Sequence, residues 1–318
     1  MVRHFVDLFE LNSDEARALV RKSLKLKQLH ARGVRTPHLP ARTLGMIFEK
    51  PSLRTRVSFQ AAIGQLGGTS IFLRDKDVGM GSRETTADFA KILSQYVDAL
   101  AVRTFAQSTV EELARHATIP VVNALSDSAH PCQAMADMLT VYESFGRLEG
   151  LSLVFVGDGN NVARSLALAA GLLGVQFALA APPGYEFPAD FRDAYRARFP
   201  ELSLVVDHDP ANAVLGADVV YTDVWASMGQ EHEAESRLKA FKPFQVNTRL
   251  MAGAKPDARF LHCLPAHRGE EVTADVLESP QSLVITQAAN RLHFQKALLL
   301  WLLLDSWPEE LAGAHEPL

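Results

Sequence analysis

The stretch Phe48-Glu-Lys-Pro-Ser-Leu-Arg-Thr-Arg-Val-Ser-Phe59 decides how the first part of this 318-residue chain folds. An apolar, strand-like run leads into it, and Pro51 stops that strand. Ser52 is a typical N-cap residue, so a helix begins directly after it. The N-terminus of such a helix offers unpaired N–H groups and the positive end of the helix dipole. Together with Arg54 and Thr55, Ser52 therefore predicts an anion site suited to phosphate.

The two arginines of this stretch are not equivalent. Arg54 and Arg56 stand two residues apart, so on a helix they point to different sides. We therefore assign Arg54 to the ligand and Arg56 to an ion pair within the fold. Taken alone, the pattern also fits a capped helix with solvated arginines.

Strand-like runs alternate with helical patterns along the chain, which predicts an α/β fold with parallel sheets. The runs are 43–48, 69–73, 99–102 and 120–125, followed by 151–156, 177–181, 202–206, 219–222 and 260–264. A turn at Gly146–Gly150 separates the two series, so we expect two lobes, each with a central parallel sheet flanked by helices. We place a first domain at 1–146 and a second at 147–286. The last helical pattern, in 287–318, is expected to fold back onto the first lobe.

The composition is that of a globular protein with a sizeable core, since 47% of the residues are hydrophobic and 22% are charged. A net charge of -5 with scattered basic residues argues against nucleic-acid binding. The longest apolar run near the end, Ala297–Leu304, falls well short of the roughly 20 residues of a membrane span. The two cysteines form no disulfide framework, and the N-terminus lacks the apolar stretch of a signal peptide. We therefore expect a cytoplasmic protein that binds neither nucleic acid nor a membrane.

A second set of polar residues follows two other predicted strands. Arg103 ends one strand, and Ser128-Ala-His-Pro-Cys-Gln133 follows the next. In such sheets, ligands gather at the carboxyl ends of the strands. A lone histidine at such a place is more often structural. Beside a phosphate site, however, His130 and Gln133 can hydrogen-bond a small carbonyl group and its NH2, and with Arg103 they form a clamp that polarises the carbonyl.

Two of these stretches resemble motifs of the carbamoyltransferases. Ser52-Leu-Arg-Thr-Arg56 resembles their carbamoyl phosphate loop, and His130-Pro-Cys-Gln133 resembles their second motif. Three further stretches are similar to the ornithine carbamoyltransferase subfamily: Gly157-Asp-Gly-Asn-Asn161, Asp223-Val-Trp-Ala-Ser-Met-Gly229 and His262-Cys-Leu-Pro265. The resemblance spans nearly the whole chain.

The resemblance implies two α/β lobes, a homotrimer or an assembly of trimers, and a site residue at each matching position. The positions that match carbamoyl phosphate contacts are Ser52, Leu53, Arg54, Thr55, Arg103, His130, Gln133 and Arg291. Cys263 and Leu264 match positions between the two substrates, and the ornithine contacts match Asn161, Asp223, Ser227 and Met228. The resemblance makes Arg103, His130 and Cys263 the expected catalytic residues. It also implies a loop, near Gly79–Thr86, that reaches the active site of the neighbouring subunit.

The implied reaction moves the carbamoyl group of carbamoyl phosphate to the δ-amine of L-ornithine, giving L-citrulline and phosphate in arginine biosynthesis. This chemistry needs a neutral amine, a polarised carbonyl and a stabilised leaving group, and it needs no covalent enzyme intermediate and no cofactor. Relatives that act on acetylornithine, aspartate or putrescine share the carbamoyl phosphate half, whereas Asp223 and Ser227-Met-Gly229 favour free ornithine. A different class of function is that of a non-catalytic phosphate-binding relative. The presence of a polar residue at every polar position of the site argues against it.

Two other interpretations have less support. Gly157-Asp-Gly-Asn-Asn-Val162 after a strand invites a dinucleotide site, but its sixth position is Val162 where close packing needs Gly or Ala. The next strand also ends without an acidic residue for a ribose hydroxyl, so a plain tight turn is the simpler interpretation. His262, Cys263 and His267 suggest a metal site, but no second ligand pair stands nearby at zinc-type spacing. We expect neither NAD nor a metal.

The chain departs from the family pattern at two places. Gln60 stands where the family usually has a glutamate, and Ile285-Thr-Gln-Ala-Ala-Asn290 replaces an acidic Asp-Glu-Ala-Glu-Asn run. Both changes remove acidic partners for Arg56 and Arg291. Because the arginines themselves remain, we expect altered stability or oligomer packing before altered chemistry.

Overall fold

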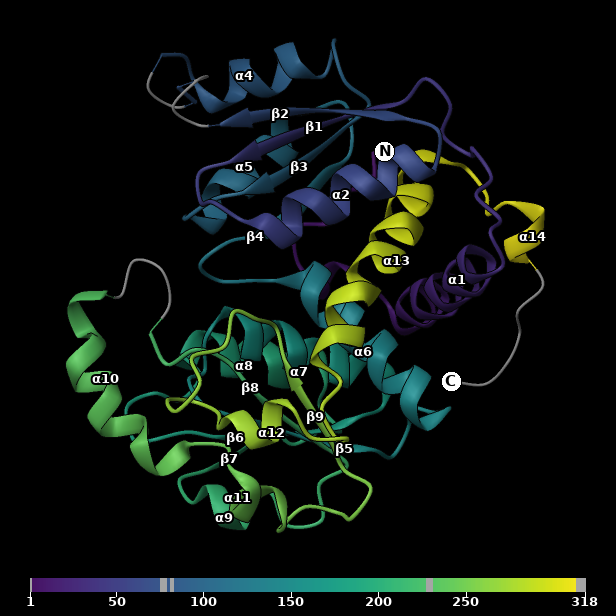
Figure 1. The fold of residues 1–318 in the computed structure, drawn as a ribbon. Helices are drawn as coiled ribbons and strands as arrows, with labels where there is room; N and C mark the ends of the chain where they lie inside the picture. The colour runs from purple at the N-terminus through teal and green to yellow at the C-terminus, as the bar shows by residue number, and fades with distance from the viewer. Residues whose placement is uncertain (1, 75–78, 81–82, 227–230, 313–318) are drawn as a thin grey trace. The chain divides into compact units, whose positions relative to one another are not determined.

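The computed structural model of the protein describes residues 2–74, 79–80, 83–226 and 231–312 (Figure 1). The chain forms two compact units. The first combines residues 1–139 with the chain from Ala289 onward, and the second is Thr140–Ala288. Helices α6 (Pro131–Phe145) and α13 (Val284–Leu303) contribute residues to both units. Among the described residues, no helix combines the length and the apolarity that crossing a membrane requires.

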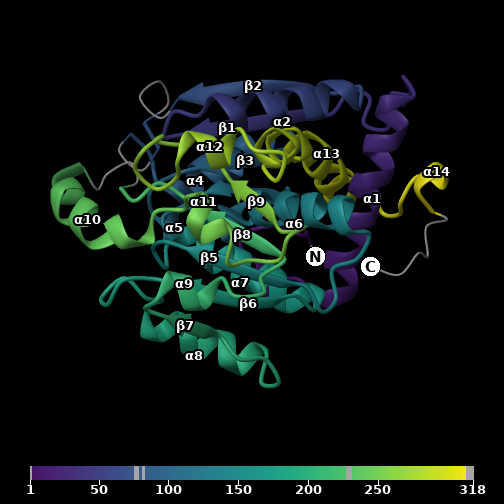
Figure 2. The same cartoon turned by 60° about the horizontal axis from the view of Figure 1, so that its bottom comes forward.

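The first unit is built on a four-stranded parallel sheet in the order β2-β1-β3-β4. Its strands are β1 (Thr43–Phe48), β2 (Thr69–Arg74), β3 (Ala99–Arg103) and β4 (Val121–Leu125). Its helices are α1 (Ser13–Ala31), α2 (Leu53–Gln65), α4 (Thr86–Leu93), α5 (Gln107–His116) and α14 (Glu309–Ala312), with the 3-10 turn η1 (Leu8–Glu10) before α1. Figures 1 and 2 show α1 and α13 side by side.

Burial and register explain how this sheet positions polar side chains. All of β3 and nearly all of β1 are buried, as expected of central strands that helices cover on both faces, whereas the edge strand β2 is partly exposed. Phe48 at the end of β1 pairs with Arg103 at the end of β3, and Arg103 pairs with Leu125 at the end of β4. The loops that follow these three strands therefore begin at the same edge of the sheet.

The second unit is built on a five-stranded parallel sheet in the order β7-β6-β5-β8-β9. Its strands are β5 (Ser152–Val156), β6 (Gln176–Ala180), β7 (Val205–Asp207), β8 (Val219–Thr222) and β9 (Arg259–His262). Its helices are α7 (Asn161–Leu173), α8 (Ala189–Arg198), α9 (Pro210–Ala213), α10 (Ala234–Phe241), α11 (Thr248–Met251) and α12 (Ala274–Leu277). Two 3-10 turns, η2 (Glu231–Glu233) and η3 (Lys242–Phe244), flank α10.

The register of this second sheet also aligns its strand ends. Val156 of β5 pairs with Thr222 of β8, and Thr222 pairs with His262 of β9. Each of these three residues is followed directly by a loop. The loops that start at Gly157, Asp223 and Cys263 consequently leave the sheet at one edge, where ligands of parallel sheets gather.

The predicted α/β fold with two parallel sheets is confirmed. The predicted run 202–206 forms only a short strand at the sheet edge, β7, because Val205 has no partner strand on its outer side and is exposed. The chain from Ala289 onward belongs to the first unit, as the predicted return of the C-terminal helix requires. There the ring centroid of Phe294 lies 6.0 Å from that of Phe5. The contacts divide the chain inside α6 and α13 rather than at the Gly146–Gly150 turn.

Candidate active site

The junction between β1 and α2 has the local structure that an anion site needs. Ser52 has an extended backbone, and its side-chain oxygen accepts the backbone N–H of Thr55 at 3.2 Å, which caps the helix. Thr55 is fully buried, Arg54 is half-buried, and Leu53 is 77% exposed. The first turn of α2 therefore carries both a positive helix end and two polar side chains at the edge where the strands end.

The two arginines of this helix lie on different sides, as predicted, and the predicted ion pair of Arg56 stays a prediction. The guanidinium carbon of Arg56 lies 3.8 Å from the centroid of the Phe72 ring. In the described part of the chain, no carboxylate lies within ion-pair distance of Arg56. The position one turn further along α2, where an acidic side chain would reach Arg56, is Gln60. Among the described residues, the contact of Arg56 is therefore a cation–π contact with the edge strand β2.

His130 lies where three predicted arginines act together. Its side chain is 5% exposed, and burial is the largest cause of a pKa well below the usual value of histidine. The charges of Arg291, Arg103 and Arg54 lower the pKa of His130 further. The imidazole is consequently neutral at neutral pH, and the first unit concentrates three guanidinium groups around it.

Arg291 is the member of this group that comes from the far end of the sequence. Its Nη2 donates to Thr55 Oγ1 at 2.7 Å, and its Nη1 donates to Gln133 Oε1 at 3.0 Å. The Gln133 amide group in turn donates to Asp137 at 2.7 Å. These bonds connect α13 to α2 and α6. Neutral side chains thus orient Arg291 where the family pattern has acidic residues nearby.

Two supporting residues at this edge escaped the sequence-based prediction, although both directly follow β1. The Glu49 carboxylate accepts the backbone N–H of Phe105 at 2.8 Å and also the hydroxyl of Thr104. Lys50 is buried, pairs with Asp127 at 2.7 Å and lies 4.2 Å from the centroid of the Phe105 ring. Both residues tie the exit of β1 to neighbouring loops. The feature of the sequence that could have identified them is their position between a predicted strand and a helix N-cap.

The cysteine two residues after His130, Cys132, has a structural environment. Cys132 is fully buried, and its thiol donates to the backbone carbonyl of Asn123 at 3.4 Å. Burial raises the pKa of Cys132 to about 12. A thiol in this state is not a nucleophile at neutral pH.

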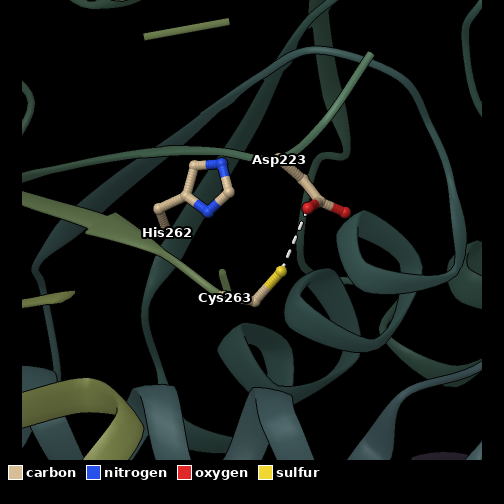
Figure 3. Close-up of side chains that lie close together, drawn as sticks. All are labelled: Asp223, His262 and Cys263. Atoms are coloured by element: carbon tan, nitrogen blue, oxygen red, sulfur yellow. Dashed lines mark hydrogen bonds between the residues drawn. The ribbon is translucent and has the colours of Figure 1, made fainter. Parts of the chain in front are cut away.

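In the second unit, Asp223, His262 and Cys263 lie close together (Figure 3). Asp223 follows β8, His262 ends β9, and Cys263 comes next. The Cys263 thiol donates to Asp223 Oδ1 at 3.0 Å, drawn as the dashed line in Figure 3. The side-chain amide of Asn160 donates to Asp223 Oδ2 at 3.3 Å. Asp223 is thus a buried carboxylate that accepts hydrogen bonds from two neutral groups, Asn160 and Cys263.

His262 holds the turn that contains Cys263 and Leu264. The backbone N–H of Leu264 donates to His262 Nδ1 at 2.9 Å, so the ring proton belongs on Nε2, which donates to Glu271 at 3.1 Å. Glu271 and His262 are both fully buried. This arrangement supports Leu264 in a left-handed backbone conformation, with φ of 57°. The contact between His262 and Glu271 was not predicted from the sequence.

The three residues weighed as metal ligands in the sequence, His262, Cys263 and His267, fall into two separate groups of side chains. Ligand atoms of Asp223, His262 and Cys263 lie within 4.8 Å of one another, and so do those of His267, Glu270 and Glu271. Both ring nitrogens of His262 already take part in hydrogen bonds. His262 therefore serves as a structural bridge between Leu264 and Glu271.

The Gly157–Asn161 loop places Asn160 rather than Asn161 against Asp223. Asn160 Oδ1 accepts the backbone N–H groups of Val162 and Ala163, both at 3.0 Å, and so caps α7. Its amide group then points to Asp223. Asn161, the residue named from the sequence, is the first residue of α7 and stays a prediction. Asn160 was missed because both of its roles depend on loop geometry.

Some predicted site residues fall outside the part of the chain that the structure describes. Ser227 and Met228, the other expected ornithine contacts, lie outside it. So do residues 81–82 of the predicted intersubunit loop near Gly79–Thr86.

Comparisons with known proteins agree with the motifs. A family model described as aspartate/ornithine carbamoyltransferase, carbamoyl-P binding domain, matches residues 3–143, and the Asp/Orn binding domain of the same family matches residues 149–302. An ornithine carbamoyltransferase from Anoxybacillus flavithermus is 52% identical over 303 residues, which cover 95% of this chain and 96% of that protein.

Two comparisons involve Pyrococcus furiosus. An anabolic ornithine carbamoyltransferase from this organism is 54% identical over 267 residues, which cover 83% of this chain and 85% of that protein. A solved structure of ornithine carbamoyltransferase from the same organism has a TM-score of 0.92 at 48% identity, covering 95% of this chain and 97% of that one. The chain therefore belongs to the aspartate/ornithine carbamoyltransferase family.

Proposed function

We propose that the protein acts as an ornithine carbamoyltransferase, moving the carbamoyl group of carbamoyl phosphate to the δ-amine of L-ornithine. The products are L-citrulline and phosphate, and the role is in arginine biosynthesis. The observation that carries the proposal is the convergence of Arg54, Arg103 and Arg291 on the buried, neutral His130. Such a site suits a small phosphorylated substrate with a carbonyl group.

The first unit binds carbamoyl phosphate in this proposal. The N-terminus of α2, with Ser52, Arg54 and Thr55, takes the phosphate. His130 is neutral, so it donates a hydrogen bond to the carbamoyl oxygen without adding a charge of its own. Arg103 adds a charged donor where negative charge develops in the transition state. Gln133 and Arg291 complete the binding set, and Leu53 lies beside it.

The second unit binds L-ornithine. Asp223 accepts the α-ammonium group through a charge-assisted hydrogen bond, since Asn160 and Cys263, which donate to it, are neutral groups. Asn161, Ser227 and Met228 supply the other ornithine contacts that the resemblance implies. Cys263 and the backbone carbonyl of Leu264 orient the δ-amine. Acetylation of the α-amine would remove the charge that Asp223 needs.

The reaction proceeds by direct attack. The neutral δ-amine forms a C–N bond to the carbamoyl carbon, the C–O bond to phosphate breaks, and the departing phosphate takes the amine proton. Positioning and electrostatic stabilisation supply the acceleration. The δ-amine must first lose a proton whose pKa in water is near the lysine value of about 10. Activity should therefore rise with alkaline pH.

The assembly and location are part of the proposal. We assign residues 1–146 to carbamoyl phosphate binding, 147–286 to ornithine binding and the C-terminal helix within 287–318 to the first domain. The proposed assembly is the homotrimer that the sequence resemblance implies, located in the cytoplasm, and a mass measurement of the native protein in solution tests the trimer.

A citrulline-type assay tests the activity. Purified protein is supplied with carbamoyl phosphate and, separately, with L-ornithine, acetylornithine, putrescine or aspartate, and the carbamoylated product is quantified. The proposal is supported if, of the four amines, only ornithine is carbamoylated rapidly, giving citrulline. Preference for another amine would assign the protein to a different carbamoyltransferase, and activity with none of them would favour a non-catalytic phosphate-binding protein.

A further inference from the structure

A single buried cation holds three segments of the second unit together. Arg237 lies on α10 and is only 6% exposed. Its Nη1 donates to Asp158 Oδ2 at 2.7 Å and to the backbone carbonyl of Trp225 at 3.0 Å. Its Nε donates to Glu233 Oε2 at 2.9 Å. One guanidinium group thus connects the loop after β5, the loop after β8 and the turn before α10.

Aromatic rings fix the orientation of this guanidinium. Its central carbon lies 5.0 Å from the ring centroid of Tyr185 and 5.9 Å from that of Phe241. Phe241 packs edge-on against Tyr185, with centroids 4.6 Å apart, and stacks on Trp225 at 6.1 Å. A planar guanidinium can lie over such rings and still donate in its own plane, which an ammonium group cannot do. The site is specific for arginine.

Two of the three segments that Arg237 contacts lead to the hydrogen bond between Asn160 and Asp223, the carboxylate of the proposed ornithine site. Asp158 stands two residues before Asn160, whose amide group donates to Asp223. Trp225 stands two residues after Asp223. Arg237 therefore contacts the chain close to both members of the Asn160–Asp223 hydrogen bond without touching either.

Electrostatics give Arg237 a second effect. Burial raises the pKa of Asp158, the hydrogen bond and charge of Arg237 lower it, and the charge of Asp223 raises it again. The two aspartates therefore repel each other across the loop. The positive charge of Arg237 is paired with the carboxylates of Asp158 and Glu233. Asp223 therefore accepts hydrogen bonds from neutral donors. Asp223 then remains the carboxylate that a substrate cation can neutralise.

We propose that Arg237 is a positioning residue for the amino-acid substrate, which holds the Asp158 and Trp225 loops in register and reserves Asp223 for the substrate's ammonium group. The inference rests on the proposed ornithine site. It assigns a role in substrate positioning to a residue outside the proposed substrate contacts, because Arg237 acts through Asp158 and Trp225.

Steady-state kinetics on four variants test this inference. Arg237→Gln keeps a polar side chain but loses the charge and the fork of donors. We expect it to raise the KM for ornithine about tenfold or more, as the loss of charged hydrogen bonds predicts, with the KM for carbamoyl phosphate changed less than about twofold. Arg237→Lys should fall between it and the wild type, because an ammonium group cannot replace the fork.

A charge-balanced pair separates charge compensation from packing. Asp158→Asn removes the partner, and the double variant Arg237→Gln with Asp158→Asn removes both charges. We expect the double variant to bind ornithine at least about threefold better than Arg237→Gln alone, because no uncompensated carboxylate is left beside Asp223. A double variant no better than Arg237→Gln would overturn the charge compensation.

The matched control is Lys239→Gln on the same helix. Lys239 pairs with Glu235 at 2.8 Å, and their side chains are 77% and 87% exposed, so this control should leave both KM values and the melting temperature unchanged. If Arg237→Gln lowers the melting temperature but keeps the wild-type KM for ornithine, Arg237 is merely structural and the inference is wrong. If the wild-type protein forms no citrulline, the proposed function itself is refuted, before any variant is compared.

Discussion

The buried histidine of α13, His293, should make the folded protein less stable as the pH falls. Its side chain is 5% exposed, and burial is the main cause that lowers its pKa from 6.5 to about 3. The charges of Lys296, His30 and Lys27 lower the pKa of His293 further. In the unfolded chain the imidazole regains its ordinary pKa, so in acid the unfolded state binds one more proton than the folded state. The contribution of His293 to stability is therefore fully present above pH 6.5 and is lost as the pH falls toward 3.

The size of the effect follows from proton linkage. One proton changes the free energy of unfolding by about 1.4 kcal/mol per pH unit. Between pH 6.5 and about 4.5, the titration of His293 should remove about 2 kcal/mol of stability. The variant His293→Gln has no imidazole to titrate, so it should lose about 2 kcal/mol less than the wild type over the same interval.

Urea unfolding at the two pH values measures this difference. The control is Phe294→Leu, a change at the neighbouring, fully buried position without a titratable group. It should lower the free energy of unfolding by the same amount at both pH values. If the wild type and His293→Gln lose equal stability on acidification, the assignment of the pH dependence to His293 is refuted.

Four further variants examine the substrate half-sites. Arg54→Ala should abolish the thermal shift that carbamoyl phosphate induces. Arg56→Ala loses its contact with Phe72, so it should keep that shift and cost about 0.5–1 kcal/mol of stability. The reverse pattern would invert the assignment of the two arginines. Cys263→Ser should retain measurable turnover, and a carbamoyl adduct in the mass spectrum of the wild type with carbamoyl phosphate alone would contradict the positioning role. Asp223→Asn should raise the KM for ornithine on the order of tenfold and leave that for carbamoyl phosphate nearly unchanged; an unchanged ornithine dependence would remove Asp223 from the substrate site.

Local chemistry made the strand ends predictable. The helix that begins after Ser52 follows from its capping side chain and from the proline that ends β1. Arg103 and the loop that contains His130 follow from the alternation of strands and helices, since parallel strands bring their carboxyl ends to one edge. Residues within a few positions of a strand end or a helix cap are thus accessible to pattern reasoning.

Pairings between distant residues were not predictable in this way. Arg291 and Thr55 are separated by 236 positions, and Arg237 and Asp158 by 79. Such pairs leave no period in the sequence, because they depend on how whole elements pack. Only the resemblance to the carbamoyltransferases identified Arg291, and nothing identified Arg237. The same limitation explains why the Phe72 ring beside Arg56 was not predicted, since that contact depends on where β2 pairs.

The departure from the family's acidic run changes how the Cys263 turn is supported. Gln287, in the first turns of α13, is fully buried and accepts the backbone N–H of His262 at 2.9 Å while donating to the hydroxyl of Tyr221 at 3.1 Å. A carboxylate at this position could accept both bonds only as a buried anion, which costs more free energy than a buried neutral amide. The amide therefore fixes the end of β9 through both a donor and an acceptor. Because His262 in turn holds the N–H of Leu264, we expect the glutamine to preserve the geometry of the turn and to affect stability before chemistry.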